Sequence, residues 1–143
     1  MTPSQALNII AHASHFSNVG SWYWSQYIAY IMTYEGYGDA SKKNADICGV
    51  GEMWGYYVGG LLATEQYEGT HFNGDDWFRP EILRQLGHNR NVRLTHLTNP
   101  LSEKQIFDCL TSDIRSHEQL KNRLISRYGR ATEIRAVFEA FGF

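Results

Sequence analysis

Residues 51–66 have the sequence GEMWGYYVGGLLATEQ, and this stretch decides the fold. Its length and its apolar residues predict a helix that ends near Gln66, although Gly55, Gly59 and Gly60 fall inside it. Each interior glycine costs a helix about 1 kcal/mol relative to alanine. Glycines are tolerated in a helix where another backbone packs closely against them. We therefore expect this helix to lie at the centre of the molecule.

Two helices are predicted before it. Thr2 and Pro3 suit an N-cap and a first helical position, and that helix runs to about Phe16 before residues 18–20, Asn-Val-Gly, end it. A second helix, rich in tryptophan and tyrosine, spans residues 22–34. The stretch from 35 to 51 is rich in Gly, Asp, Asn and Lys, and it predicts a loop.

Short helices with clear boundaries fill the C-terminal part of the chain. One is predicted from Pro80 to about Leu86, and residues 87–100 are irregular or briefly extended. Three more follow, two of them opened by the capping boxes at 102–105 and 116–119, and the last covering about 131–141. No strand pair is predicted. The sequence thus predicts an all-α protein: a helical region at 1–79 and a C-terminal subdomain at 80–143 that packs on it.

Composition narrows the function classes. The net charge is -2, but the chain divides unevenly: residues 1–78 have two lysines against eight acids, and residues 79–143 have eleven basic residues against seven acids. Cys48 and Cys109 lack metal or redox spacing and are predicted to be separate buried thiols. No run of 18 apolar residues exists, so we expect no membrane span. The N-terminus has no signal-peptide pattern, which predicts a cytoplasmic protein.

One face of the first helix carries side chains that can bind metal. At 100° per residue, Asn8, His12 and His15 fall within about 60° of one another. Side chains four residues apart on a helix can reach one ion. The alternative is that both histidines are ordinary polar residues on a solvent-facing surface.

The stretch from Ile10 to Phe16, IAHASHF, resembles the tail of a His-Glu-x-x-His segment of gluzincin-type zinc metallopeptidases. Residues 51–57, GEMWGYY, resemble the later segment in which such enzymes carry a glutamate ligand, here Glu52. The resemblance covers about residues 4–60. It implies a helical metallopeptidase-like half-domain in which His12 and Glu52 occupy two zinc-ligand positions.

The other half of the signature is replaced. Asn8 stands where the first histidine ligand would be, and an amide oxygen is a poor zinc ligand. Ile9 stands where the general base would be, and it cannot take a proton from zinc-bound water. The resemblance therefore implies a degenerate or truncated domain without peptidase activity. His15 could replace the missing ligand, so His12, His15 and Glu52 form the predicted, weak zinc site.

Two alternatives from other classes stay open. The aromatic surface could bind a protein partner or a second copy of the chain. The basic C-terminal helices could meet nucleic acid, although the net charge of +4 is modest and solvated arginines explain it as well. Tyr56 and Tyr57, one turn past Glu52, are predicted to be core or rim residues. The remaining histidines, His71, His88, His96 and His117, are predicted to lie on the surface.

Overall fold

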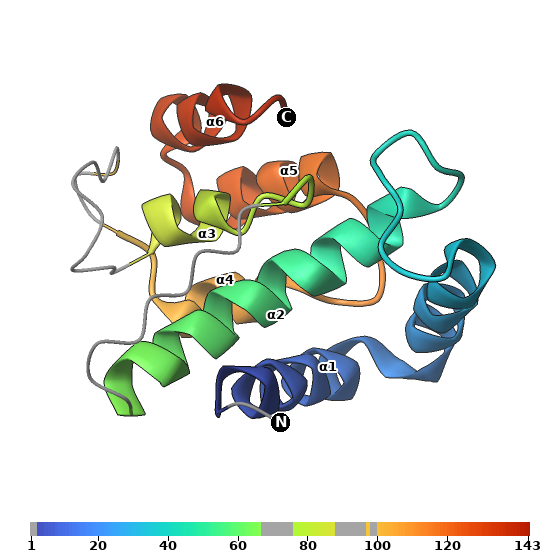
Figure 1. Ribbon diagram of the computed structural model, residues 1–143. Coiled ribbons are helices and arrows are strands. Elements are labelled where there is room, and N and C mark those ends of the chain that lie inside the picture. The colour runs from blue at the N-terminus through green and yellow to red at the C-terminus, as the bar shows by residue number, and fades with distance from the viewer. Residues whose placement is uncertain (1–2, 67–75, 88–96, 98–99) are drawn as a thin grey trace.

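A computed structural model describes residues 3–66, 76–87, 97 and 100–143, and in these ranges the protein is all-α, as predicted (Figure 1). No strand occurs among the described residues, where the only β-bridge is an isolated one between Gly87 and Leu101. The helices are α1 (Pro3–Tyr34), α2 (Ala45–Gln66), α3 (Glu81–Leu86), α4 (Glu103–Cys109), α5 (His117–Tyr128) and α6 (Ala131–Ala140).

The two N-terminal helices of the prediction form one element, α1, with a sharp kink. Gly20 has φ 83° and ψ 178°, a non-helical conformation that side chains other than glycine rarely adopt. The predicted break near residue 20 is therefore confirmed. Asn18 holds the kink in place because its Nδ2 donates to the carbonyl oxygens of Phe107 and Leu110, at 3.0 and 2.8 Å.

The central helix begins earlier than its sequence indicated. α2 starts at Ala45 rather than Gly51, so the prediction of a loop from 35 to 51 was wrong over its last residues. Ile47, Cys48 and Val50 in this first part are buried, which explains why the segment is helical despite its loop-like neighbours. α2 crosses the middle of the molecule, with α1 along one side and α3 to α6 along the other (Figure 1).

The C-terminal helices follow their predicted boundaries. Ser102 and Gln105 form the complete capping box of α4. Ser116 caps α5 by accepting from the backbone N–H of Gln119, but the Gln119 side chain accepts from the Arg115 N–H instead of closing a second box.

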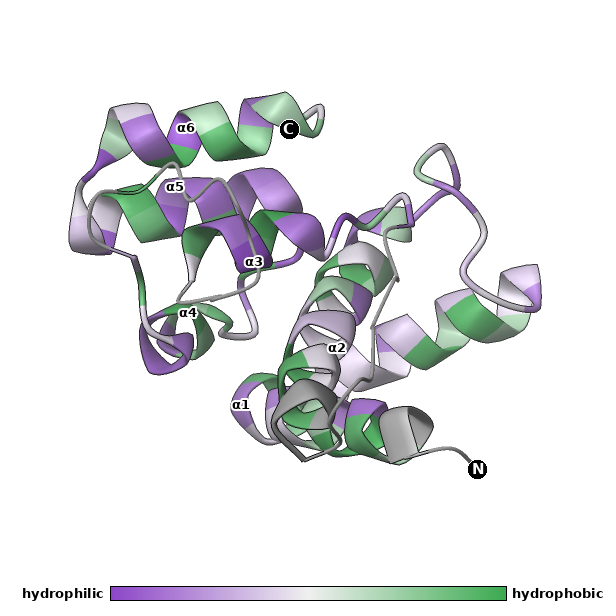
Figure 2. Cartoon of the chain, turned by 60° about the vertical axis from the view of Figure 1, so that its left-hand side comes forward, coloured by the Kyte–Doolittle hydropathy of each residue, from purple (hydrophilic) through white to green (hydrophobic). Residues whose placement is uncertain are grey.

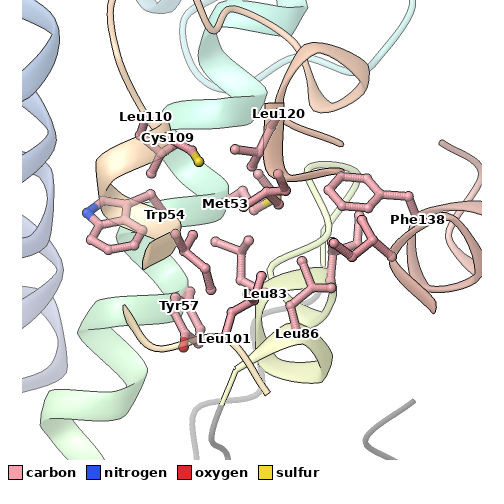
Figure 3. Packing of buried hydrophobic residues seen from close by; sticks show 14 of the residues in the cluster. Met53, Trp54, Tyr57, Leu83, Leu86, Leu101, Cys109, Leu110, Leu120 and Phe138 are labelled. Atoms are coloured by element: carbon pink, nitrogen blue, oxygen red, sulfur yellow. The ribbon is translucent and has the colours of Figure 1, made fainter. Parts of the chain in front are cut away.

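Two hydrophobic clusters lie on different sides of α2. The larger joins α2 with α3 to α6, and Figure 3 shows Met53, Trp54 and Tyr57 of α2 meeting Leu83, Leu86, Leu120 and Phe138. The smaller joins the aromatic half of α1 to the first turns of α2, through Tyr23, Tyr27 and Tyr30. The C-terminal helices thus share their core with α2. No helix in the described ranges is long and apolar enough to span a membrane.

Candidate functional site

The first half of α1 packs closely against α2 because glycines face it. A Cβ at Gly55 would lie 2.5 Å from Nε2 of His12, and one at Gly59 would lie 3.0 Å from the Cα of Asn8. A Cβ at Gly55 would require the His12 ring to shift, and one at Gly59 would press on the main chain of Asn8. The expectation that the interior glycines mark a close helix–helix approach is consistent with this geometry, and the approach brings His12 to α2.

His12 and Glu52 lie together at this interface. Nε2 of His12 is 3.5 Å from Oε1 of Glu52, and the two side chains are 14% and 2% exposed. The hydroxyl of Tyr27, from the second half of α1, donates a hydrogen bond to the same Oε1. Three segments therefore converge on one carboxylate oxygen.

The spacing of this pair suits two ligands of one ion. Zinc lies about 2.0–2.2 Å from nitrogen and oxygen ligands, so two ligands at a tetrahedral angle are about 3.4 Å apart. The distance between Nε2 of His12 and Oε1 of Glu52 is 3.5 Å. The pair alone supplies two ligands, whereas a catalytic zinc site in a protein has three.

His15 occupies a different environment from His12. It is completely buried, and its ring stands edge-on to that of Tyr23 at a centroid distance of 5.1 Å. Burial and the neighbouring His12 lower the pKa of His15 to about 3, so its imidazole is neutral. Across the residues that the structure describes, no three His, Cys, Asp or Glu side chains are grouped to hold a metal ion. The structure thus brings two of the three predicted ligands, His12 and Glu52, into contact, while His15 packs against Tyr23.

Several buried polar atoms in this layer have no hydrogen-bond partner. They are Asn8 Nδ2, His12 Nδ1, both ring nitrogens of His15, Trp24 Nε1 and Glu52 Oε2. A buried polar atom without a partner costs about 1–3 kcal/mol, and such atoms are rare in native proteins. These six atoms between α1 and α2 are candidates for contact with ordered water, a polar ligand or an ion.

The two replaced signature positions differ in exposure. Asn8 is partly buried beside Gly59, whereas the side chain of Ile9 is 55% exposed on the outer face of α1. The position that resembles that of the general base therefore carries an apolar side chain that is largely exposed to solvent.

Tyr27 was not predicted to be a partner of Glu52. The sequence does indicate that this part of the helix has a tyrosine-rich face, because the spacing places four tyrosines on one side: Tyr23, Tyr27, Tyr30 and Tyr34. That face packs on α2, and Tyr23 donates to the carbonyl oxygen of Ile47 at 3.0 Å. The aromatic helix is thus part of the site as well as of the core.

Other singled-out residues have structural positions. Cys48 and Cys109 are buried free thiols, as predicted. Tyr57 is buried in the core, and Tyr56 is half-buried and stacks on Phe78. The prediction that His117 lies on the surface was wrong. His71, His88 and His96 fall outside the described residues.

His117 is buried because distant segments cover it. Its ring stacks on Phe143 at 4.1 Å, and its Nε2 lies 2.6 Å from the carbonyl oxygen of Phe78. Burial lowers the pKa of His117, which keeps the ring neutral. It serves to join α5 to the chain end and to the segment before α3.

Most cations of the C-terminal helices contact other parts of the chain. Arg123 pairs with Asp113, Arg127 donates to the backbone of Asp108, and Lys121 donates to the carbonyl oxygen of Phe143. Arg115 lies over the ring of Trp22, with its guanidinium carbon 4.3 Å from the centroid. Nucleic-acid binding by these helices stays a prediction that their side-chain geometry does not favour.

Comparison of the sequence with protein-family models, with curated proteins and with solved structures gave no match.

Proposed function

We propose that the chain is a degenerate zinc-metallopeptidase-like domain without peptidase activity. The observation that carries this proposal is the contact between His12 and Glu52, 3.5 Å apart on helices that resemble the two ligand-bearing segments of gluzincins. Two residues 40 positions apart in sequence meet at the spacing of neighbouring zinc ligands.

The surrounding polar atoms support the fit of an ion to this pair. Glu52 Oε2 and His12 Nδ1 are buried and have no partner, and the neighbouring Asn8 and His15 also carry unpartnered atoms. His12 and Glu52 would hold zinc here, with His15 as the candidate third ligand. Zinc, when bound, polarises a carbonyl group and lowers the pKa of water. The Tyr27 hydroxyl donates a hydrogen bond to the Glu52 carboxylate. An ion that binds this carboxylate therefore has to displace the hydroxyl.

The absence of peptidase activity follows from positions 8 and 9. The amide of Asn8 neither binds zinc well nor accepts a proton at neutral pH, and Ile9 has no ionisable group at all. Loss of a general base alone costs about 10²–10⁴ in rate. His12 and Glu52 are spaced as two zinc ligands would be, but positions 8 and 9 supply no general base that could take a proton from zinc-bound water.

Zinc titration by calorimetry tests the ancestry. An Asn8→His variant adds an imidazole one turn before His12, and we expect it to bind zinc at least about tenfold more tightly than the unchanged chain. Asn122→His is the matched control, because it places a new histidine on the exposed surface of α5. Equal affinities for the two variants would contradict the proposal. A His12→Ala change in the Asn8→His background should abolish the gain.

A protease assay tests the second part of the proposal. With an unstructured protein substrate and added zinc, the unchanged chain should give no cleavage above background. Cleavage that a chelator stops and that His12→Ala removes would show that the domain is an enzyme. The Asn8→His, Ile9→Glu double variant is the positive comparison, since it restores both a ligand and a base.

A further inference from the structure

The large exposed apolar side chains of the described residues are concentrated on α1. Those on this helix are Ile9, Ile10, Phe16, Trp22, Ile28 and Met32, and they are between 45% and 74% exposed. Residues 3–34 contain no Asp, Glu, Lys or Arg, which is unusual for a helix that faces solvent. Figure 2 shows the contrast, because α5 is largely purple whereas α1 after the kink is mostly green and pale.

Four of these side chains, Ile9, Phe16, Ile28 and Met32, lie on either side of the kink, and the partly buried Trp24 connects the two groups. Ile9 and Phe16 are seven residues apart and therefore share one face of the first half of α1. The kink at Gly20 brings Phe16 to Trp24, with ring centroids 5.5 Å apart. Ile28 and Met32 follow Trp24 at intervals of four. We call these five residues the α1 strip. Trp22 lies outside it.

We infer that the α1 strip is an interaction surface for a second copy of this chain. A charge-free surface gives a charged partner nothing to pair with. In a dimer with a two-fold axis, however, the same surface of each copy packs against that of the other. An uncharged surface can do this without repulsion between like charges. The acidic residues of the first 78 positions all come after Tyr34 in the sequence.

The exposed area suits such an interface. Four of the five side chains are 45–74% exposed and Trp24 is partly buried, so together they present roughly 400 Å² of apolar surface per copy. A standard interface buries about 800 Å² on each partner, of which somewhat more than half is apolar. The α1 strip with the adjoining Ile10 therefore supplies nearly all the apolar area that a stable dimer needs.

Sedimentation equilibrium of the full chain tests this inference. We expect a dimer with a dissociation constant in the micromolar range. Ile28→Lys places a lysine of each copy in the interface and should raise that constant at least about tenfold. The matched control is Gln26→Lys, which adds the same charge to an exposed position about 160° around the same helix, and it should leave the constant unchanged.

Three outcomes would overturn the inference. They are a monomer at concentrations up to about 100 µM, a dimer that Ile28→Lys leaves intact, or a dimer that both lysine variants weaken equally. Met32→Lys is a second variant in case Ile28→Lys does not fold. Met32 is 74% exposed, so the substitution does not disturb the core. Circular dichroism of every variant checks that the helices remain.

Discussion

The substitution Gly59→Ala tests whether the close approach of α1 and α2 is real. A Cβ at position 59 would lie 3.0 Å from the Cα and 3.1 Å from the backbone nitrogen of Asn8. Both of these are main-chain atoms, so no side-chain rotation relieves the contact. Carbon atoms prefer separations of about 3.5–4.0 Å, and the two helices would therefore have to move apart by about half an ångström.

Two opposing terms set the size of the effect. Alanine is a better helix former than glycine and contributes about 1 kcal/mol to stability. Overpacking a tight contact costs about 1–3 kcal/mol. We expect a net loss of about 1 kcal/mol in the free energy of unfolding, which corresponds to a fall of about 3 °C in Tm for a chain of this length.

Urea denaturation followed by circular dichroism measures this difference. Ala29→Gly is a matched variant because Ala29 is exposed within α1 after the kink, so it reports the helix-propensity term alone. We expect Ala29→Gly to lose about 1 kcal/mol.

The direction in which Gly59→Ala changes the free energy of unfolding shows whether the new Cβ meets the main chain of Asn8. If Gly59→Ala gains as much stability as Ala29→Gly loses, helix propensity alone explains both variants and nothing opposes the new Cβ. The close approach, and with it the placement of His12 beside Glu52, would then be refuted.

Three further predictions concern single contacts. Asn18→Ala removes the two hydrogen bonds from Asn18 to the end of α4. The carbonyl oxygen of Leu110 then loses its partner, whereas that of Phe107 keeps the N–H of Leu110, so the free energy of unfolding in urea should fall by about 1–3 kcal/mol; an unchanged value would contradict the assigned contacts. The pKa of His15 is lowered from 6.5 to about 3, so the unfolded chain binds a proton that the folded chain does not. Stability should be complete above about pH 6.5 and should fall by up to about 1.4 kcal/mol per pH unit on acidification towards pH 3, whereas His15→Leu should show a flatter profile. Ser102→Ala removes the cap of α4 and should lower the free energy of unfolding by about 1 kcal/mol in the same urea assay. An unchanged free energy would show that the capping box is not formed in solution.

Local sequence signals predicted those elements whose boundaries depend on local chemistry. Gly20 predicted the break in α1 because a positive φ suits glycine, and Ser102 predicted the start of α4 because its side chain satisfies a free N–H group. The start of α2 was missed because Ile47 and Val50 are helical through tertiary burial, which no local pattern records. His117 was assigned to the surface because the segments that cover it come from elsewhere in the chain.

In the candidate site, too, features that depend on local helix geometry were predicted, and features that depend on tertiary packing were missed. Helical spacing correctly put His12 and His15 on one face of α1, since spacing depends only on the geometry of the helix. It could not show that His12 meets Glu52 while His15 stands against Tyr23. That difference arises from the kink at Gly20, which brings the aromatic half of α1 beside the first half. Tyr27 reaches Glu52 for the same reason.

The polar layer between α1 and α2 is difficult to explain as packing alone. Asn8, His12 and His15 lie in a tight helix–helix contact where apolar side chains would leave no polar atom unpaired. Replacing buried polar groups with apolar groups of similar shape is often neutral or stabilising, whereas each unpaired group costs about 1–3 kcal/mol. A contact that served stability alone would favour the apolar solution. Under the proposed function, these imidazoles and the carboxylate of Glu52 are the polar groups of a ligand site, which the zinc affinity of the Asn8→His variant tests directly.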